Sequence, residues 1–207
     1  DLEACVMRVG CIAYATDQGI SHVAKSFYDA DVITDIMLFR HGSRRTHLEW
    51  YPADTVELVG RPFNGPKVEE FVSKIDVCLF VETPFDWGFL DYCRKRNVRT
   101  AIIPMYECCP VTRPFEPDRW ICPSKLDLEY FPGSPYVPVP VDPSMWKQRI
   151  QARRFLHNGG HLGLRGHKGT LELLQAVEHI RSPLELTVRA QDDTGLQALL
   201  QKEPSVR

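Results

Sequence analysis

The segment from Arg154 to Thr170 concentrates residues whose types and spacing suit the binding of an anion. It contains five of the chain's 13 glycines, and Arg165 and Lys168 stand among them. A backbone without Cβ atoms can approach a ligand closely and point several N–H groups at it. We therefore predict a phosphate or diphosphate site in this segment.

The elements expected on either side of this segment support the prediction. Residues 155–158 are predicted to form a short strand, and residues 170–180 a helix with its apolar side chains on one face. A glycine turn between a strand end and a helix start gathers free N–H groups at the positive end of the helix dipole. Gly159 and Gly160 would open this turn, and a plain turn without a ligand is the alternative.

The first part of the chain offers a second glycine-bearing loop. An apolar strand is predicted over residues 7–15, and the polar loop 16–21 follows it. Gly19 in this loop would let the backbone approach a ligand, and His22 at the start of the next helix could contact it. A solvent-facing helix position is the alternative for His22.

Polar side chains also follow two later strands. Glu82 comes directly after the predicted strand 77–81, at the end of the sheet where α/β proteins bind ligands. Its carboxylate could contact a ligand or exchange a proton with it, or it could cap the neighbouring loop. Tyr106 and Glu107 stand in a similar place after the predicted strand 100–103.

Predicted strands and helices alternate along the chain, and these elements must position the residues named above. Strands are predicted at residues 7–15, 36–39, 55–59, 77–81, 100–103, 120–122, 155–158 and 184–188. Helices are predicted at 22–29, 66–75, 87–96, 125–130, 146–153, 170–180 and 194–202. Strands alternating with helices in this way imply a parallel sheet covered on both faces. The predicted fold class is therefore α/β and Rossmann-like.

A proline-rich segment divides the chain. Five prolines fall within residues 132–143, which predicts an extended, poorly hydrogen-bonded linker between an N-terminal domain, 1–131, and a second unit, 144–207. The second unit has room for two strands, whereas sheets usually have about 4 to 6. We expect it to be an incomplete Rossmann-like domain whose exposed sheet edge and apolar helix face favour self-association.

The composition of the chain indicates which partners and which cellular compartment to expect. The formal charge is −2 and the sequence has no basic run, so we expect no nucleic-acid partner. Seven cysteines without a C-x-x-C pair indicate reduced thiols that serve mainly in packing, as in a cytoplasmic protein. No apolar run approaches the length of a membrane span, although peripheral contact with the inner face of a membrane is left open.

Four stretches together resemble the GT-B glycosyltransferases, and specifically glycosyltransferase family 4. They are the loop TDQGISHVA from Thr16, the strand ends VETPF from Val81 and IPMYE from Ile103, the passage ICPS from Ile121 with VPVPVDP from Val137, and the glycine segment that ends in K-G-T at Thr170. Their order across nearly the whole chain carries the resemblance.

The resemblance implies a retaining sugar transfer from a nucleotide sugar to a carbohydrate or lipid-linked acceptor, with no metal or further cofactor. The donor diphosphate would lie on Gly159, Gly160, Arg165 and Lys168, with Gly19 approaching from the first domain. Cations placed there would stabilise the charge that grows on the leaving phosphate. A solvated Arg165 and an exposed helix-start Lys168 are the alternatives. Glu82 and His22 would be the catalytic residues, and Tyr106 and Glu107 would lie on the acceptor side.

The chain departs from the family pattern in two places. His161 follows the glycine pair where family members often have arginine. The family's E-x7-E pair is missing from the second half, and the pair Glu49 and Glu57 has this spacing by chance. We therefore expect a C-terminally truncated enzyme that is inactive by itself.

Three other assignments compete with this one. A non-catalytic nucleotide-sugar or carbohydrate-binding module of the same fold would retain the loops without the chemistry. Asp29 and Asp31 form a D-x-D pattern of the kind that binds metal in other glycosyltransferases, but here they follow a helix and we expect no metal. A nucleotide P-loop is disfavoured because Lys168 precedes Gly169 instead of following a glycine.

Overall fold

The computed structural model describes residues 7–39, 46–52, 55–58, 65–84, 86–105, 108–145, 153–160, 169–181 and 183–190. The chain forms two compact units, Asp1–Asp142 and Pro143–Arg207.

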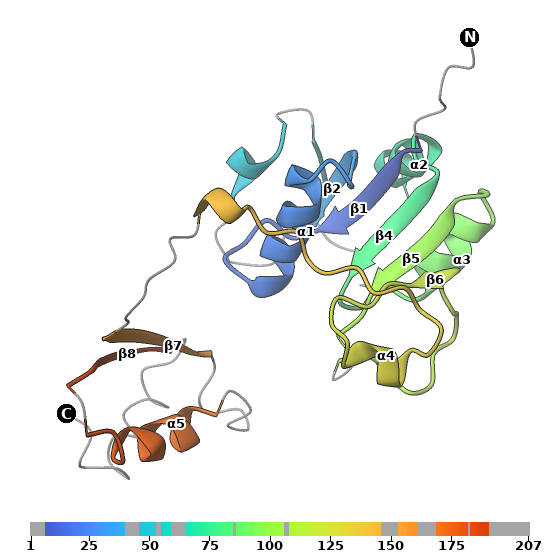
Figure 1. The fold of residues 1–207 in the computed structure, drawn as a ribbon. Coiled ribbons are helices and arrows are strands. Elements are labelled where there is room, and N and C mark those ends of the chain that lie inside the picture. The colour runs from blue at the N-terminus through green and yellow to red at the C-terminus, as the bar shows by residue number, and fades with distance from the viewer. Residues whose placement is uncertain are drawn as a thin grey trace. The chain divides into compact units, whose positions relative to one another are not determined.

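The first unit is built on a six-stranded sheet in which all paired strands are parallel (Figure 1). Its strands are β1 (Val9–Ala13), β2 (Asp35–Phe39), β3 (Val56–Leu58), β4 (Val77–Val81), β5 (Arg99–Ile103) and β6 (Arg119–Trp120). Their order is β3-β2-β1-β4-β5-β6. This arrangement confirms the predicted α/β class with a Rossmann-like parallel sheet.

Helices lie on both faces of this sheet because successive strand residues point to opposite sides. The helices are α1 (Gly19–Asp29), α2 (Pro66–Ser73), α3 (Gly88–Arg94) and α4 (Asp127–Tyr130), and a 3₁₀ turn, η1, spans Leu48–Trp50. On β1, Cys11 packs in the same cluster as Phe27 of α1, whereas Ile12 packs with Phe71 of α2 and Leu90 of α3. Two apolar layers therefore enclose the sheet.

Gly10 in β1 lets two side chains of the second apolar layer come close to the β1 backbone. A Cβ atom placed on Gly10 would lie 2.7 Å from both Ile75 Cγ2 and Phe71 Cζ. Carbon atoms in contact prefer about 3.5–4.0 Å. Glycine at this position allows Phe71 in α2 and Ile75, two residues beyond the end of α2, to pack directly against the β1 backbone.

Helix α1 begins earlier than predicted. Gly19 was expected in the loop before the helix, but it lies in the first helical turn. The reason is that the Gln18 carbonyl already accepts the amides of Ser21 and His22, at 3.0 and 3.2 Å. The buried hydroxyls of Thr16 and Ser21 also contact each other at 3.1 Å, which holds the tight connection from β1.

The proline-rich segment makes more backbone hydrogen bonds than its composition predicted. Cys122 donates its amide to the Pro135 carbonyl at 2.9 Å, and Val137 donates to the Cys122 carbonyl at 2.9 Å. Tyr136 thereby pairs in parallel with Cys122, and Val139 packs against the core. Residues between the prolines retain their N–H groups, so the segment can still extend one edge of the first unit.

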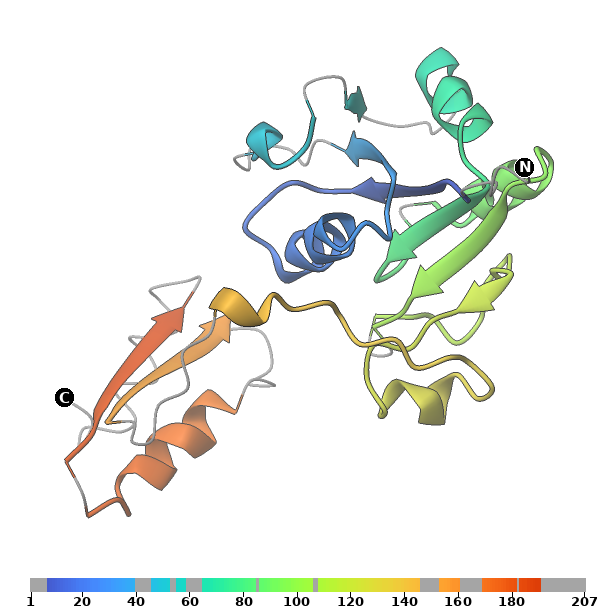
Figure 2. The same cartoon turned by 45° about the horizontal axis from the view of Figure 1, so that its top comes forward.

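The second unit contains two parallel strands and a helix among its described residues (Figure 2). These are β7 (Arg154–Gly160), α5 (Thr170–Val177) and β8 (Glu185–Ala190), and the 3₁₀ turn η2 spans Pro143–Met145. Strand β7 runs two residues beyond its predicted end. Most of the predicted helix 146–153, and all of the predicted helix 194–202, lie outside the described residues.

The cysteines and the helices agree with two expectations from composition. Six cysteines in the described parts are free thiols, and four of them are buried: Cys11, Cys78, Cys93 and Cys122. Cys108 is exposed and Cys109 is half-buried, so this pair does not serve in core packing. Within the described ranges, every helix is too short or too polar to cross a membrane.

Candidate functional site

The carboxyl ends of β1 and β4 meet at the point where the strand order reverses. The chain leaves β1 toward β2 and β3, then crosses to the other side of β1 to form β4. Connections from two neighbouring parallel strands therefore diverge there, which is where open α/β sheets bind ligands. The loop after β1 and the residues after β4 share this edge.

Glu82 directly follows β4 at this edge and has an unusual backbone. Its φ is +77°, in the left-handed region that side chains with a Cβ rarely adopt. Its amide donates to the Ile103 carbonyl at 2.8 Å, which continues the β4–β5 pairing by one residue. Among the described residues, the half-buried Glu82 carboxylate has no hydrogen-bond or ion-pair partner. A residue with a strained backbone therefore carries a carboxylate that could contact a ligand.

His22 lies one turn into α1, at the same edge. Its side chain is exposed, and the centre of its ring is 5.0 Å from that of Trp50 at an interplanar angle of 46°. The helix positions it because its amide is anchored on Gln18. The imidazole can therefore contact both solvent and a molecule bound at this edge.

His47 also lies at this edge and was not among the predicted site residues, although both of its ring nitrogens have partners. Its Nδ1 lies 2.8 Å from Glu49 Oε1, and its Nε2 lies 3.0 Å from Asp17 Oδ1. Its ring stacks on Trp50, with centres 4.8 Å apart and planes 11° from parallel. Ionised carboxylates only accept hydrogen bonds, so both contacts are satisfied together when both ring nitrogens carry a proton.

This arrangement holds η1 against the loop after β1. The His47 amide donates to the Ala15 carbonyl at 2.6 Å, so backbone and side chain both connect the two segments. Asp17 and His47 are 30 residues apart, and no local pattern links them. The local signal that could have pointed to this contact was the presence of polar residues after β1 and before β3. Glu49 belonged to the E-x7-E spacing set aside as chance, and in the structure it is a partner of His47.

These residues form a candidate polar site at the carboxyl edge of the first unit in two groups: Glu82 after β4, and His22, His47, Asp17 and Trp50 around the loop after β1 and η1. The first group offers a carboxylate with no partner among the described residues, and the second offers an exposed imidazole beside one fixed between carboxylates. Such groups can accept hydroxyl protons and donate to oxygen atoms. Tyr106 and Glu107, predicted on the same edge, lie outside the described residues.

The second unit shows part of the predicted anion loop. Gly159 and Gly160 lie in β7 and not in a turn, because the pairing with β8 continues to Gly160 and Ala190 across an irregularity after Asn158. Gly169 precedes α5 with φ +65°, a conformation that favours glycine. Arg165 and Lys168 lie outside the described residues, so their placement stays a prediction.

A side-chain hydrogen bond connects β7 to the start of α5. His157 Nε2 lies 2.8 Å from Thr170 Oγ1, and Thr170 is buried. The glycine-rich connection therefore begins and ends on elements that are linked directly. His157 was not among the predicted site residues, because its pairing with a residue 13 positions away depends on the loop closing back.

The described residues contain no group of three or more His, Cys, Asp or Glu side chains that could hold a metal ion. Two cavities lined by described residues lie at the amino edge of the sheet. A cavity of about 570 Å³ borders the amino ends of β4, β5 and β6, and one of about 330 Å³ borders those of β1 and β2. We assign the main site to the carboxyl edge because the diverging connections and the strained Glu82 occur there.

No family model and no curated sequence matches the chain.

Proposed function

We propose that the chain is part of a glycosyltransferase that transfers a sugar from a nucleotide-sugar donor to a carbohydrate or lipid-linked acceptor. The observation that carries the proposal is Glu82, a left-handed residue at the point where the strand order reverses, whose carboxylate has no hydrogen-bond or ion-pair partner among the described residues. Strained backbone at such a position is more often retained for a ligand than for stability. The order of the four motif stretches along the chain supports the donor class.

The proposed roles follow from the charges that develop during transfer. Departure of a nucleoside diphosphate leaves negative charge on a phosphate oxygen, which Lys168, Arg165 and the amides around Gly169 would stabilise. Glu82 and His22 would contact the acceptor hydroxyl or the sugar, and Glu82 could take up a proton. His47 would hold η1 and Trp50 in place, as a positioning residue.

The test measures donor binding and turnover in the intact protein that contains this chain. We expect UDP- or GDP-sugars to bind, and to be hydrolysed or transferred when an acceptor mixture is supplied. Lys168→Ala should lower kcat by about 10²–10³-fold, which is the usual loss when one preorganised donor is removed. Glu82→Gln should lower kcat while leaving donor affinity nearly unchanged.

A matched control is Glu129→Gln, which changes an exposed carboxylate on α4 far along the chain from the site. It should leave both binding and turnover unchanged. Binding without turnover in the intact protein would contradict the transferase assignment and favour a non-catalytic nucleotide-sugar or carbohydrate-binding module. Absence of binding to any nucleotide sugar would contradict both.

A further inference from the structure

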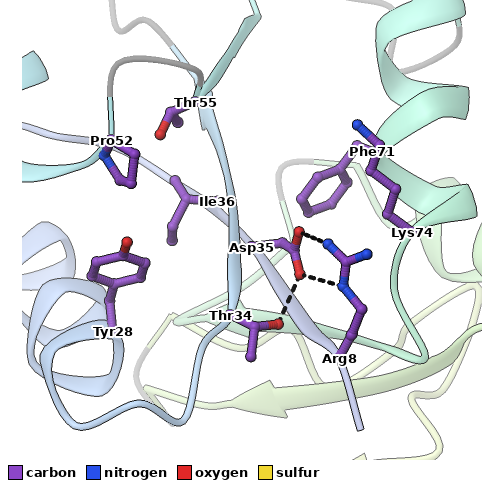
Figure 3. A pocket seen from close by; sticks show the side chains of 9 residues that line it. All are labelled: Arg8, Tyr28, Thr34, Asp35, Ile36, Pro52, Thr55, Phe71 and Lys74. Carbon is purple, nitrogen blue, oxygen red and sulfur yellow. Dashed lines mark hydrogen bonds and ion pairs between the residues drawn. The ribbon is translucent and has the colours of Figure 1, made fainter. Parts of the chain in front are cut away.

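The cavity at the amino ends of β1 and β2 is separate from the proposed transferase site. It measures about 330 Å³ and is lined by residues that precede or begin β1, β2 and β3, together with side chains of α1 and α2 (Figure 3). This volume lies in the range of small-molecule sites, about 300–1,000 Å³. It lies at the edge of the sheet opposite to Glu82, so a role in sugar transfer does not account for it.

A fixed ion pair forms one wall of this cavity. Arg8 Nη2 donates to Asp35 Oδ1, and Arg8 Nε donates to Asp35 Oδ2 at 3.2 Å (Figure 3). Asp35 Oδ2 also lies 2.7 Å from Thr34 Oγ1. The two-point contact holds both side chains in one plane, and the guanidinium retains N–H groups beyond those used on Asp35.

The remaining polar groups of the cavity include the hydroxyls of two residues. Tyr28 and Thr55 line the cavity, and their hydroxyl oxygens make no hydrogen bond within the described part of the chain. The Tyr28 ring is held edge-on by Tyr51, with centres 5.1 Å apart. The cavity therefore presents hydroxyls, which both donate and accept, beside a fixed aromatic ring.

The charges that border the cavity cancel. Arg8 is paired with Asp35, and the second cation in the wall, Lys74, donates to Glu70 Oε1 at 2.6 Å. An anionic ligand would have to compete with both carboxylates, and a cationic ligand with both cations. A neutral molecule can bind without breaking either pair.

We propose that this cavity binds a neutral polyhydroxylated molecule of monosaccharide size. Ring hydroxyls would bond to Tyr28, Thr55 and the free N–H groups of Arg8, while the apolar face of the molecule would pack beside Tyr28 and Pro52. The proposal does not depend on the transferase assignment, because it concerns the opposite edge of the sheet.

The experiment follows backbone amide resonances of the full chain during titration with two neutral probes, D-glucose and myo-inositol. We expect saturable shifts at Tyr28, Ile36 and Thr55, and none at Ser21 or Glu82. The dissociation constant should be on the order of 1 mM, since ligands this small seldom bind more tightly through hydroxyl contacts. Tyr28→Phe and Thr55→Val should each weaken binding by about two- to tenfold, the usual range for one neutral hydrogen bond.

Thr112→Val is the matched control, because Thr112 is exposed and does not line the cavity. It should bind both probes as the unchanged chain does. The proposal is overturned if neither probe gives saturable shifts at the cavity, if the shifts occur at Ser21 and Glu82 instead, or if Tyr28→Phe and Thr55→Val together leave affinity unchanged. Larger shifts at the same amides with inorganic phosphate would overturn the assignment to a neutral ligand.

Discussion

At the scale of single residues, Glu82 departs furthest from what its residue type favours. A left-handed conformation costs a residue with a Cβ roughly 1–2 kcal/mol. Asp31 and Asn97 also have positive φ, but aspartate and asparagine tolerate it better than glutamate does. The short connection after β4 imposes the conformation on Glu82, because its amide completes the pairing with β5.

Replacing Glu82 tests this strain directly. Glu82→Gly should be more stable than Glu82→Ala by about 1 kcal/mol, because glycine adopts positive φ without a steric cost. Chemical denaturation of the two variants gives the difference. Glu70, an exposed residue inside α2, is the matched position, and there alanine should be the more stable by about 1 kcal/mol. The same order at both positions would show that Glu82 is not strained.

At the scale of elements, the packing of α2 on β1 depends on one missing side chain. The space above Gly10 is filled by Phe71 and Ile75, both of which are buried. Cores are packed at crystal-like density, so an added methyl group there must displace a neighbour. The register of α2 on the sheet, and hence the direction in which the chain enters β4, follows from this contact.

Gly10→Ala should lower the free energy of unfolding by about 1–3 kcal/mol, the usual cost of overpacking a core. Gly19→Ala is the matched control, because nothing lies within 4 Å of a Cβ placed at Gly19, in the first turn of α1. That variant should be as stable as the original chain or slightly more so. Urea denaturation of both variants makes the comparison. Equal stabilities would mean that α2 shifts on the sheet without cost.

At the scale of the whole molecule, the first unit has two apolar layers that bury several weakly acidic groups. Burial raises the pKa of the Cys11 thiol to about 12, and burial also raises the pKa values of the Cys78 thiol and the Tyr51 hydroxyl. These buried thiols and the buried hydroxyl make the stability of the first unit depend on pH.

The second unit exposes Phe155 and Leu156 on β7. The expectation that the chain associates with itself stays a prediction.

We expect the chain to lose stability in alkaline solution. An unfolded cysteine ionises near pH 8.5, whereas Cys11 in the folded chain keeps its proton to about pH 12. The folded state therefore binds more protons between these values, so the contribution of the thiol to stability is constant below about pH 8 and falls above it, by up to about 1.4 kcal/mol per pH unit for each such group.

Urea denaturation under reducing conditions between pH 7 and pH 10.5 measures this slope. Cys11→Ala should make it shallower by the contribution of one group, even though the variant is less stable at neutral pH. Thr112→Ala, which changes an exposed side chain that does not titrate, should leave the slope unchanged. A flat profile above pH 9 in the original chain would show that the buried thiols do not control stability.

Local patterns in the sequence were enough to predict the class of fold and the approximate positions of the strands and α-helices that the structure describes. A continuous apolar run predicted β4 at its observed residues, and Pro66 marked the start of α2. The same reasoning placed Glu82 at the carboxyl edge, because a polar residue directly after a buried parallel strand has to emerge there. The boundaries of α1 and β7 were wrong, since a glycine usually read as loop can continue a helix or a paired strand when its backbone groups find partners.

The sequence by itself therefore determined which segments become strands and helices, since periodicity and turn residues act over a few positions. Only the tertiary structure decided which strands are neighbours and which side chains meet. His47 reaches Asp17 across 30 residues, Gly10 accommodates the packing of Phe71 and Ile75, and Arg8 pairs with Asp35 at the amino edge. Such contacts depend on strand order and on the closing of connections, which no local pattern encodes.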